Sequence, residues 1–295
     1  MKRILFAVLL YAFIRAVAPA QPRADHLILI GLDGWGGYSM DKAEMPAVSE
    51  QMTRGSWTMQ KRSVYPSSSA PNWASMFMGA GPELHCYTEW GSRAPEFPPR
   101  VTGRNGIFPT IFQIARDKYP EAEIGVLYDW DGIKYLVDTL SLSYQAQSPD
   151  YQQFPGRLAD MAAEYIIARR PMLAAICFDE PDHTGHTAGH DTPAYYARLR
   201  ELDTYIACII EALKTAGIYD STVIIITADH GGIDKGHGGR TMMEMETPFI
   251  IAGPGISASG RFDDSMMQCD VAATIAAILD IPQPQVWTGR PINVR

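Results

Sequence analysis

The chain has 295 residues, of which 46% are hydrophobic and 20% are charged, so it has ordinary globular composition with ample material for a core. Its formal net charge of −8 at pH 7 argues against nucleic acid as a structural partner, but not against a nucleotide in a metal-containing pocket. The cysteines are Cys86, Cys177, Cys208 and Cys269. None forms a C-x-x-C pair, and the sequence leaves both disulfides and buried free thiols open.

The segment 1–20 has the layout of a secretory signal. Two basic residues near the start are followed by an apolar run over 4–14 and by Ala18-Pro19-Ala20, which fits an A-x-A cleavage site. Arg15 interrupts the apolar run and argues against a stable membrane span, so a retained anchor is the alternative. No later stretch is long and apolar enough to span a bilayer. We therefore expect a signal peptide and an exported protein, either periplasmic or secreted.

Five short apolar runs predict strands that are buried on both faces. They span 26–32, 123–128, 172–178, 222–228 and 248–253. Runs of this kind are typical of parallel sheets, because helices cover both faces of such sheets. The sequence therefore predicts a mostly parallel central sheet.

Helical patterns alternate with these strands. The clearest helix spans 193–216, where Thr192 is a cap followed by proline in the first turn. Further helices are expected near 45–53, 71–78, 108–118, 156–170 and 270–279. The segments 82–104 and 141–155 are expected to be irregular, and neither has the composition of a linker. We therefore predict an α/β fold of three layers, α/β/α, with a single domain over residues 21–295.

Side chains that bind metals follow three of the predicted strands, at the sheet edge where open α/β folds bind ligands. They are Asp33 after the first strand, Asp182 and His186 after the third, and Asp229, His230 and His237 after the fourth. Zinc accepts such a mixed set, whereas calcium and magnesium prefer oxygen ligands. Divalent charge would also offset the cost of burying acids at strand ends. The sequence thus predicts a site for two metal ions.

Each of these motifs has an ordinary explanation when taken alone. An acid followed by glycine, as at Asp33, is common in turns, and Asp182-x-x-x-His186 also fits a helix cap with a surface histidine. The pair Asp229-His230 is the better signal, because two adjacent ligands cannot both lie in the core. The remaining histidines are expected in loops or at the surface, although His183 and His190 are candidates for lining the pocket.

A candidate nucleophile lies near the start of a predicted helix. Three serines precede Ala70-Pro71-Asn72, and proline belongs in the first turn of a helix. Ser69 is therefore expected at the helix N-terminus, where free N–H groups and the helix dipole stabilise an anion. Serine is also a common N-cap without any chemistry. On these residues alone, both roles of Ser69 stay open.

These motifs together carry a family resemblance. They are GLDG (31–34), YPSSSAPNW (65–73), FDEPDHTGH (178–186), ADHGG (228–232) and HGG (237–239). In this order they resemble the alkaline phosphatase superfamily, and most closely its nucleotide pyrophosphatase/phosphodiesterase branch. The resemblance implies an alkaline-phosphatase-like fold and a catalytic domain over 21–295. It also implies a hydrolase of phosphate esters, chiefly of phosphodiester or nucleotide pyrophosphate bonds.

The resemblance further implies a role for each motif residue. One zinc ion would be bound by Asp182, His186 and His237, and a second by Asp33, Asp229 and His230. Ser69 would be the nucleophile, would contact the second zinc as an alkoxide and would form a phosphoseryl intermediate. Asn72 would donate a hydrogen bond to a non-bridging phosphate oxygen. Two Zn²⁺ ions are the expected cofactors, with other divalent metals as alternatives, and a small phosphate ester or nucleotide is the expected substrate.

The chain departs from that branch at several positions. The nucleophile is serine where threonine is usual, Trp73 stands where histidine is common, and the gap from His230 to His237 is short where longer members carry an insertion. The sequence therefore specifies the identity of the substrate less closely than it specifies the metal chemistry. Candidates for an aromatic wall around a leaving group are Trp73, Tyr87, Trp90 and the stretch 128–131. Aromatic residues beside a pocket, however, more often pack than recognise a ligand.

Three other functions are alternatives. Ser69-Ala70-Pro71 also resembles the start of the sulfatase motif, but no arginine stands at position 73, and the histidine-rich ligands disfavour a single calcium site. A phosphomonoesterase needs a cation for the terminal phosphate oxygens, and the candidates are Arg62, Arg93 and Arg240. From another class, a secreted binding protein would hold purely structural metals. Structural zinc sites are usually closed and rich in thiolates, and no cysteine is among these ligands.

Overall fold

The computed structural model describes residues 24–294, so the predicted signal segment 1–20 lies outside the described residues. Eight strands of the described part form one sheet in the order β4-β3-β5-β1-β6-β7-β2-β8. The strands are β1 (His26–Asp33), β2 (Gly55–Arg62), β3 (Ile124–Tyr128), β4 (Tyr144–Gln147), β5 (Leu173–Pro181), β6 (Thr222–Ala228), β7 (Glu246–Ala252) and β8 (Gly260–Arg261). All five predicted strands are therefore confirmed.

The sheet is mostly parallel, as predicted. β1 pairs in parallel with β5 and β6, and β3 pairs in parallel with β4 and β5. β7 is the reversed strand, because it runs antiparallel to both β6 and β2. The expectation that 141–155 is irregular is wrong for β4, whose side chains are mostly exposed and gave no buried pattern. β2 and β8 were not predicted.

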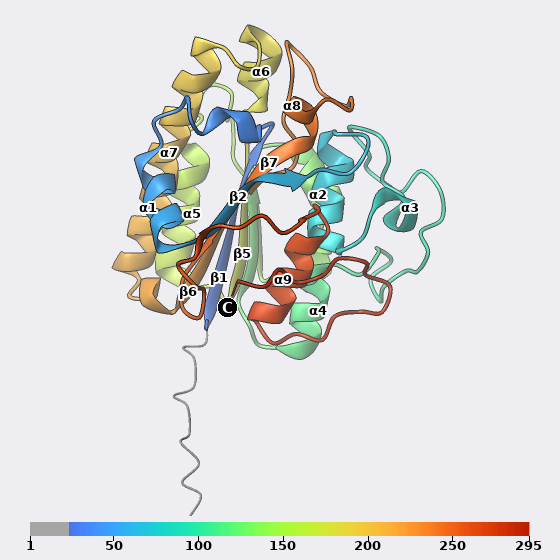
Figure 1. Ribbon diagram of the computed structural model, residues 1–295. Helices are drawn as coiled ribbons and strands as arrows, with labels where there is room; N and C mark the ends of the chain where they lie inside the picture. The colour runs from blue at the N-terminus through green and yellow to red at the C-terminus, as the bar shows by residue number, and fades with distance from the viewer. Residues whose placement is uncertain (1–23, 295) are drawn as a thin grey trace, which may run out of the picture.

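Helices cover both faces of the sheet (Figure 1). One layer holds α1 (Pro46–Arg54), α5 (Arg157–Arg169) and α7 (Pro193–Thr215), and the other holds α2 (Ser69–Met78), α4 (Ile111–Lys118) and α9 (Asp270–Ile278). The shorter helices are α3 (Pro82–His85), α6 (Asp182–Ala188) and α8 (Met242–Met245), and the 3-10 turns are Gly37–Ser39, Asp131–Tyr135, Thr139–Ser141 and Tyr219–Ser221. Within 24–294, no helix combines the length and apolar character needed to cross a bilayer.

The central strand β1 shows how the sequence specifies the layers. Leu27 and Leu29 join the hydrophobic cluster under α2, α4 and α9, whereas Ile28, Ile30 and Leu32 join the cluster under α1, α5 and α7. Burying one such side chain contributes roughly 1.5–3 kcal/mol, so neither face of β1 tolerates a charged group. Polar side chains can enter only where the strand ends, at Asp33. The buried strands therefore place the chemistry at their carboxyl ends.

Candidate active site

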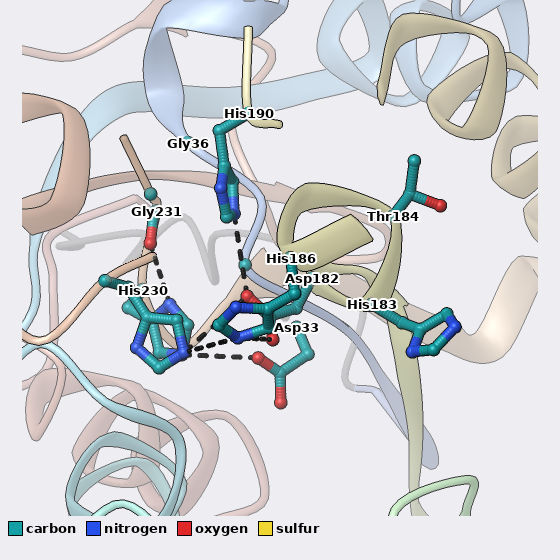
Figure 2. A network of polar contacts seen from close by, with 12 residues as sticks. Asp33, Gly36, Asp182, His183, Thr184, His186, His190, His230 and Gly231 are labelled. Carbon is teal, nitrogen blue, oxygen red and sulfur yellow. Dashed lines mark hydrogen bonds and ion pairs between the residues drawn. The ribbon is translucent and has the colours of Figure 1, made fainter. Parts of the chain in front are cut away.

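The predicted metal ligands come together at the carboxyl ends of β1, β5 and β6 (Figure 2). Asp33 is the last residue of β1, Asp182 directly follows β5, and Asp229-His230 directly follows β6. Ligand atoms of Asp182, His186 and His237 lie within 4.8 Å of one another, as do those of Asp33, Asp182 and His230. The Asp229 Oδ2 atom is 3.3 Å from Nε2 of His230. The two groups are therefore joined through Asp182, which the sequence had assigned to one of them alone.

Helix α6 explains the spacing of its two ligands. It begins at Asp182, and residues four apart lie on the same face of a helix. The Asp182 Oδ2 atom is accordingly 3.1 Å from Nε2 of His186. The N-cap of α6 is Pro181, which makes no side-chain cap bond, so the cap interpretation of Asp182 is wrong and the contact with His186 is the one that forms.

Three imidazoles are oriented by backbone carbonyls. Their Nδ1 atoms lie against the oxygens of Lys235 for His186 (2.9 Å), of Gly231 for His230 (2.8 Å) and of Ser67 for His237 (3.2 Å). With a proton on Nδ1, each ring turns its Nε2 atom toward the acids, as metal-binding histidines do. Nε2 of His186 and Nε2 of His237 are 3.1 Å apart, a spacing that needs a shared proton or a common cation.

The protonation of these rings follows from their surroundings. Burial lowers the pKa of His230 and of His237 to about 4, so both are neutral near pH 7. The hydrogen bond to Asp182 raises the pKa of His186 to about 9. The Nε2 atom of His186, protonated near pH 7, therefore lies 3.1 Å from both Oδ2 of Asp182 and Nε2 of His237.

The carboxylates show a shortage of positive charge. Burial raises the pKa of Asp33 well above its ordinary value and that of Asp229 to about 7, and neighbouring carboxylates add to both effects. Burial also acts to raise the pKa of Asp182, but the neighbouring imidazoles of His186 and His190 outweigh it and hold this pKa below its usual range. Oδ1 of Asp182 and Oδ2 of Asp229 are buried without a hydrogen-bond partner. These acids, the unpartnered oxygens and the imidazoles fit divalent metal ions.

Ser69 lies beside this cluster, with 8% of its surface exposed. It is the first residue of α2, and Ser68 is the N-cap, so the prediction of Ser69 at the helix N-terminus is confirmed. Its Oγ atom is 3.2 Å from Nε2 of His230 and 3.5 Å from Oδ1 of Asp33. The hydroxyl therefore adjoins the Asp33 and His230 side of the cluster.

The contacts of Asn72 differ from the role that the family resemblance implies for it. Its Oδ1 accepts from the Val64 amide at 2.7 Å, and its Nδ2 donates to the carbonyls of Ser68 and Pro66 at 2.9 and 3.1 Å. The side chain is fully buried, so in this geometry it holds the 64–68 loop instead of facing the cluster. Donation to a phosphate oxygen would require Asn72 to give up one of these bonds.

The expected aromatic wall is largely absent from the described surface. Trp73 is buried, and its Nε1 donates to Oδ2 of Asp33 at 3.0 Å, so it orients the Asp33 carboxylate. Tyr87 and Tyr128 are buried as well, and of the predicted aromatic rings only that of Trp90 is largely exposed. Trp73, Tyr87 and Tyr128 therefore pack inside the protein, which is the alternative that the sequence favoured for such aromatic residues.

Two histidines that were expected in loops or at the surface are buried instead. His85 is enclosed beside Ser75, with its Nε2 at 3.0 Å from the serine Oγ. His190 points toward Asp182, with its Nε2 at 3.5 Å from Oδ1, whereas His183 is turned away from the cluster (Figure 2). A signal for His190 was present in the sequence, because Asp182, His186 and His190 are spaced four residues apart.

Comparisons with known proteins agree with the motifs. The sequence model of the family described as type I phosphodiesterase / nucleotide pyrophosphatase matches residues 27–249. A bis(5'-adenosyl)-triphosphatase of Mus musculus is 25% identical over 226 residues, covering 70% of this chain and 47% of the relative. A 2,3-bisphosphoglycerate-independent phosphoglycerate mutase of Cereibacter sphaeroides is 28% identical over 195 residues, covering 61% of this chain and 36% of the relative. The chain thus spans half or less of the length of these relatives.

Two solved structures share the fold. Murine ectonucleotide pyrophosphatase / phosphodiesterase 5, solved in complex with AMP, superposes with a TM-score of 0.70 at 15% identity and covers 92% of this chain and 97% of its own. A 2-O GAG sulfatase, BT1596, superposes with a TM-score of 0.73 at 14% identity and covers 92% and 73% of the two chains. At these identities the likeness shows the fold alone, which is the alkaline-phosphatase-like α/β fold expected from the motifs.

Proposed function

The chain belongs to the type I phosphodiesterase / nucleotide pyrophosphatase family, and we propose that it is an exported hydrolase of phosphodiester or nucleotide pyrophosphate bonds with Ser69 as nucleophile. The position of the Ser69 hydroxyl carries this proposal. Its Oγ lies at the N-terminus of α2, within 3.5 Å of both a buried imidazole and a buried carboxylate. A serine needs such an activating environment to attack phosphorus. Export rests on the signal-like segment 1–20.

Two divalent metal ions, zinc by the chemistry of the ligands, complete the proposed site. Asp182, His186 and His237 would hold one ion, and Asp33, Asp229 and His230 would hold the other. Three imidazoles among six ligands favour zinc over calcium or magnesium. When bound, these ions would supply Lewis acidity that stabilises negative charge on the phosphoryl group and on Ser69.

The remaining roles belong to side chains and backbone groups of the chain itself. Ser69 Oγ forms the bond to phosphorus as the leaving group departs, and hydrolysis of the phosphoserine regenerates the hydroxyl. The N-terminal end of α2 adds favourable potential for the anionic phosphate. Trp73 orients Asp33, and the amides of Gly34 and His230 orient Asp229 through bonds of 3.1 and 2.7 Å to its Oδ1. Asn72 keeps the loop before Ser69 in place.

Replacing Ser69 with alanine tests the proposal. With bis(p-nitrophenyl) phosphate as substrate, Ser69→Ala is expected to lose turnover by about a thousandfold or more while retaining its bound metal. Ser68→Ala is the matched control, since Ser68 is the N-cap but makes no side-chain cap bond. Acid quenching during turnover should trap phosphate on Ser69, detectable by peptide mass spectrometry. A Ser69→Ala protein that turns over at the wild-type rate would exclude the serine mechanism.

The same assays separate the alternatives. A sulfatase or a phosphomonoesterase would prefer p-nitrophenyl sulfate or p-nitrophenyl phosphate to the diester. The sulfatase alternative is the weaker of the two, because position 73 holds a buried tryptophan bonded to Asp33 instead of an arginine. A binding protein with structural metals would hydrolyse none of the three esters.

A further inference from the structure

A pocket lined by arginine, tyrosine and methionine side chains adjoins the loop that precedes Ser69. Its volume is about 430 Å³. The residues that line it are Arg62, Tyr65, Arg240, Met242 and Met245. Tyr65 is 66% exposed and Met242 is 49% exposed, so a flat ring and a thioether chain face solvent there. We call this set of five residues the Arg240 pocket.

The Arg240 pocket is tied to the candidate active site by its backbone. Tyr65 stands four residues before Ser69, and Arg240 stands three residues after His237. The two segments are joined, because Ser67 Oγ donates to the Gly239 carbonyl at 2.7 Å. The pocket also lies at the same sheet edge as Asp33 and Asp229, since β2 ends at Arg62 on that side.

The position of Arg240 is fixed on both sides. The amide of Gly239 donates to Oε1 of Glu244 at 2.7 Å, and Thr241 forms a capping box with the same glutamate at the start of α8. The backbone at Arg240 is therefore ordered before any ligand arrives. Such preorganisation lowers the entropic cost of binding.

The Arg240 pocket carries unbalanced positive charge in an acidic protein. Arg62 pairs with Glu246 at 3.0 Å, and Arg93 pairs with Asp131 at 3.7 Å. The Arg240 side chain, in contrast, has no hydrogen bond or ion pair with any residue of 24–294. The Nε group of Arg62 is buried without a hydrogen-bond partner and is a further spare donor. Of the three arginines weighed from the sequence, Arg240 is thus the one left free.

We propose that the Arg240 pocket binds a second anionic group of the substrate, carried on a flat or apolar substituent of the scissile phosphate. Arg240 recognises the charge, and Tyr65 with Met242 contacts the substituent. This inference rests on the proposed hydrolysis of phosphate esters and adds to it a requirement for charge beyond the reacting phosphorus. A phosphate and a carboxylate share the required chemistry.

Three diesters that release p-nitrophenolate test the assignment. They are p-nitrophenyl phenyl phosphate, its p-carboxyphenyl analogue and its p-phosphonophenyl analogue. The wild-type protein is expected to show kcat/KM about threefold to tenfold higher for a charged ester than for the neutral one, mainly through KM. Arg240→Ala should bring this ratio close to one, and Arg240→Lys should restore part of it. Arg93→Ala, at another exposed arginine, should leave the ratio at its wild-type value.

The outcomes separate the inference from the function on which it rests. A preference for the phosphonate identifies a second phosphate as the natural group, and a preference for the carboxylate identifies an organic acid; both support the pocket. Equal rates for all three esters, or a ratio unchanged in Arg240→Ala, would overturn the assignment while leaving the hydrolase intact. If the metal-loaded wild-type protein cleaves none of the diesters, the proposed function itself fails.

Discussion

Asp129 offers a test of the electrostatics outside the metal ligands. It follows β3 directly and is 2% exposed. Its Oδ2 accepts from the Asp179 amide at 3.3 Å, but its Oδ1 is buried without a hydrogen-bond partner. No lysine or arginine in 24–294 forms an ion pair with it. The Asp129→Asn substitution keeps the shape and an acceptor for that amide, and it removes the ionisation.

Burial raises the pKa of Asp129 to about 7 from an ordinary value of 3.8. Between these values the folded protein binds a proton that the unfolded chain has lost, so the free energy of unfolding falls as the pH rises. The interval between the two pKa values spans about three pH units, which corresponds to a decrease of about 4 kcal/mol in the free energy of unfolding. Between pH 5 and pH 8 the free energy of unfolding falls over about two of these pH units, up to the pKa of about 7, and the loss is about 3 kcal/mol. Asp129→Asn should not show this loss.

Urea unfolding followed by tryptophan fluorescence at pH 5, 6, 7 and 8 measures the difference between variant and wild type. The stability of Asp129→Asn relative to wild type should rise by about 3 kcal/mol from pH 5 to pH 8 and level off above pH 7. Asp263→Asn, at a side chain that is 86% exposed, is the control and should follow the wild-type profile. Parallel profiles for Asp129→Asn and wild type would refute the reasoning.

Two further predictions concern the metal ligands. Because the pKa of His186 is raised to about 9 and that of Asp229 only to about 7, a metal ion must displace the His186 proton between these values, and the apparent zinc affinity should rise about tenfold per pH unit from pH 7 to pH 9. Chelator competition at several pH values measures this slope, and a flat profile would contradict it. Trp73→Phe removes the donor to Asp33, so zinc affinity should fall about tenfold to a hundredfold while the far-ultraviolet circular dichroism stays unchanged.

The buried strands could be predicted because both of their faces lie in the core. β6 was predicted with the bounds that the structure gives it, since all of its side chains are buried. The direction of β7 could not be predicted, because an apolar run is the same in a parallel and an antiparallel neighbour. β2 ends in Lys61-Arg62, and this charged pair hid the strand in the sequence. The structure buries Lys61 completely and uses its ammonium to bind the Ala228 carbonyl at 2.7 Å.

The part of the candidate site that could be predicted from the sequence consists of residues that come at the end of a buried strand. Asp33, Asp182 and Asp229 were found because each comes at the end of a buried run, and parallel strands bring such ends together. The sharing of Asp182 between two ligand groups could not be found in this way, because it depends on where the start of α6 places the Asp182 carboxylate relative to Asp33 and His230. The role of Asn72 depends similarly on the fold of the loop that precedes it.

The structure explains one departure from the family pattern, the tryptophan at position 73 where histidine is common. Its ring lies against Gly31 so closely that a Cβ atom on the glycine would come within 2.3 Å of Cη2. The glycine within β1 therefore makes room for the indole, whose N–H then reaches Asp33 at the end of the same strand. A histidine is too small to fill this space. The residue at position 73 thus supports Asp33, a proposed metal ligand, and is not available to a substrate, so the proposed recognition groups are Tyr65 and Arg240.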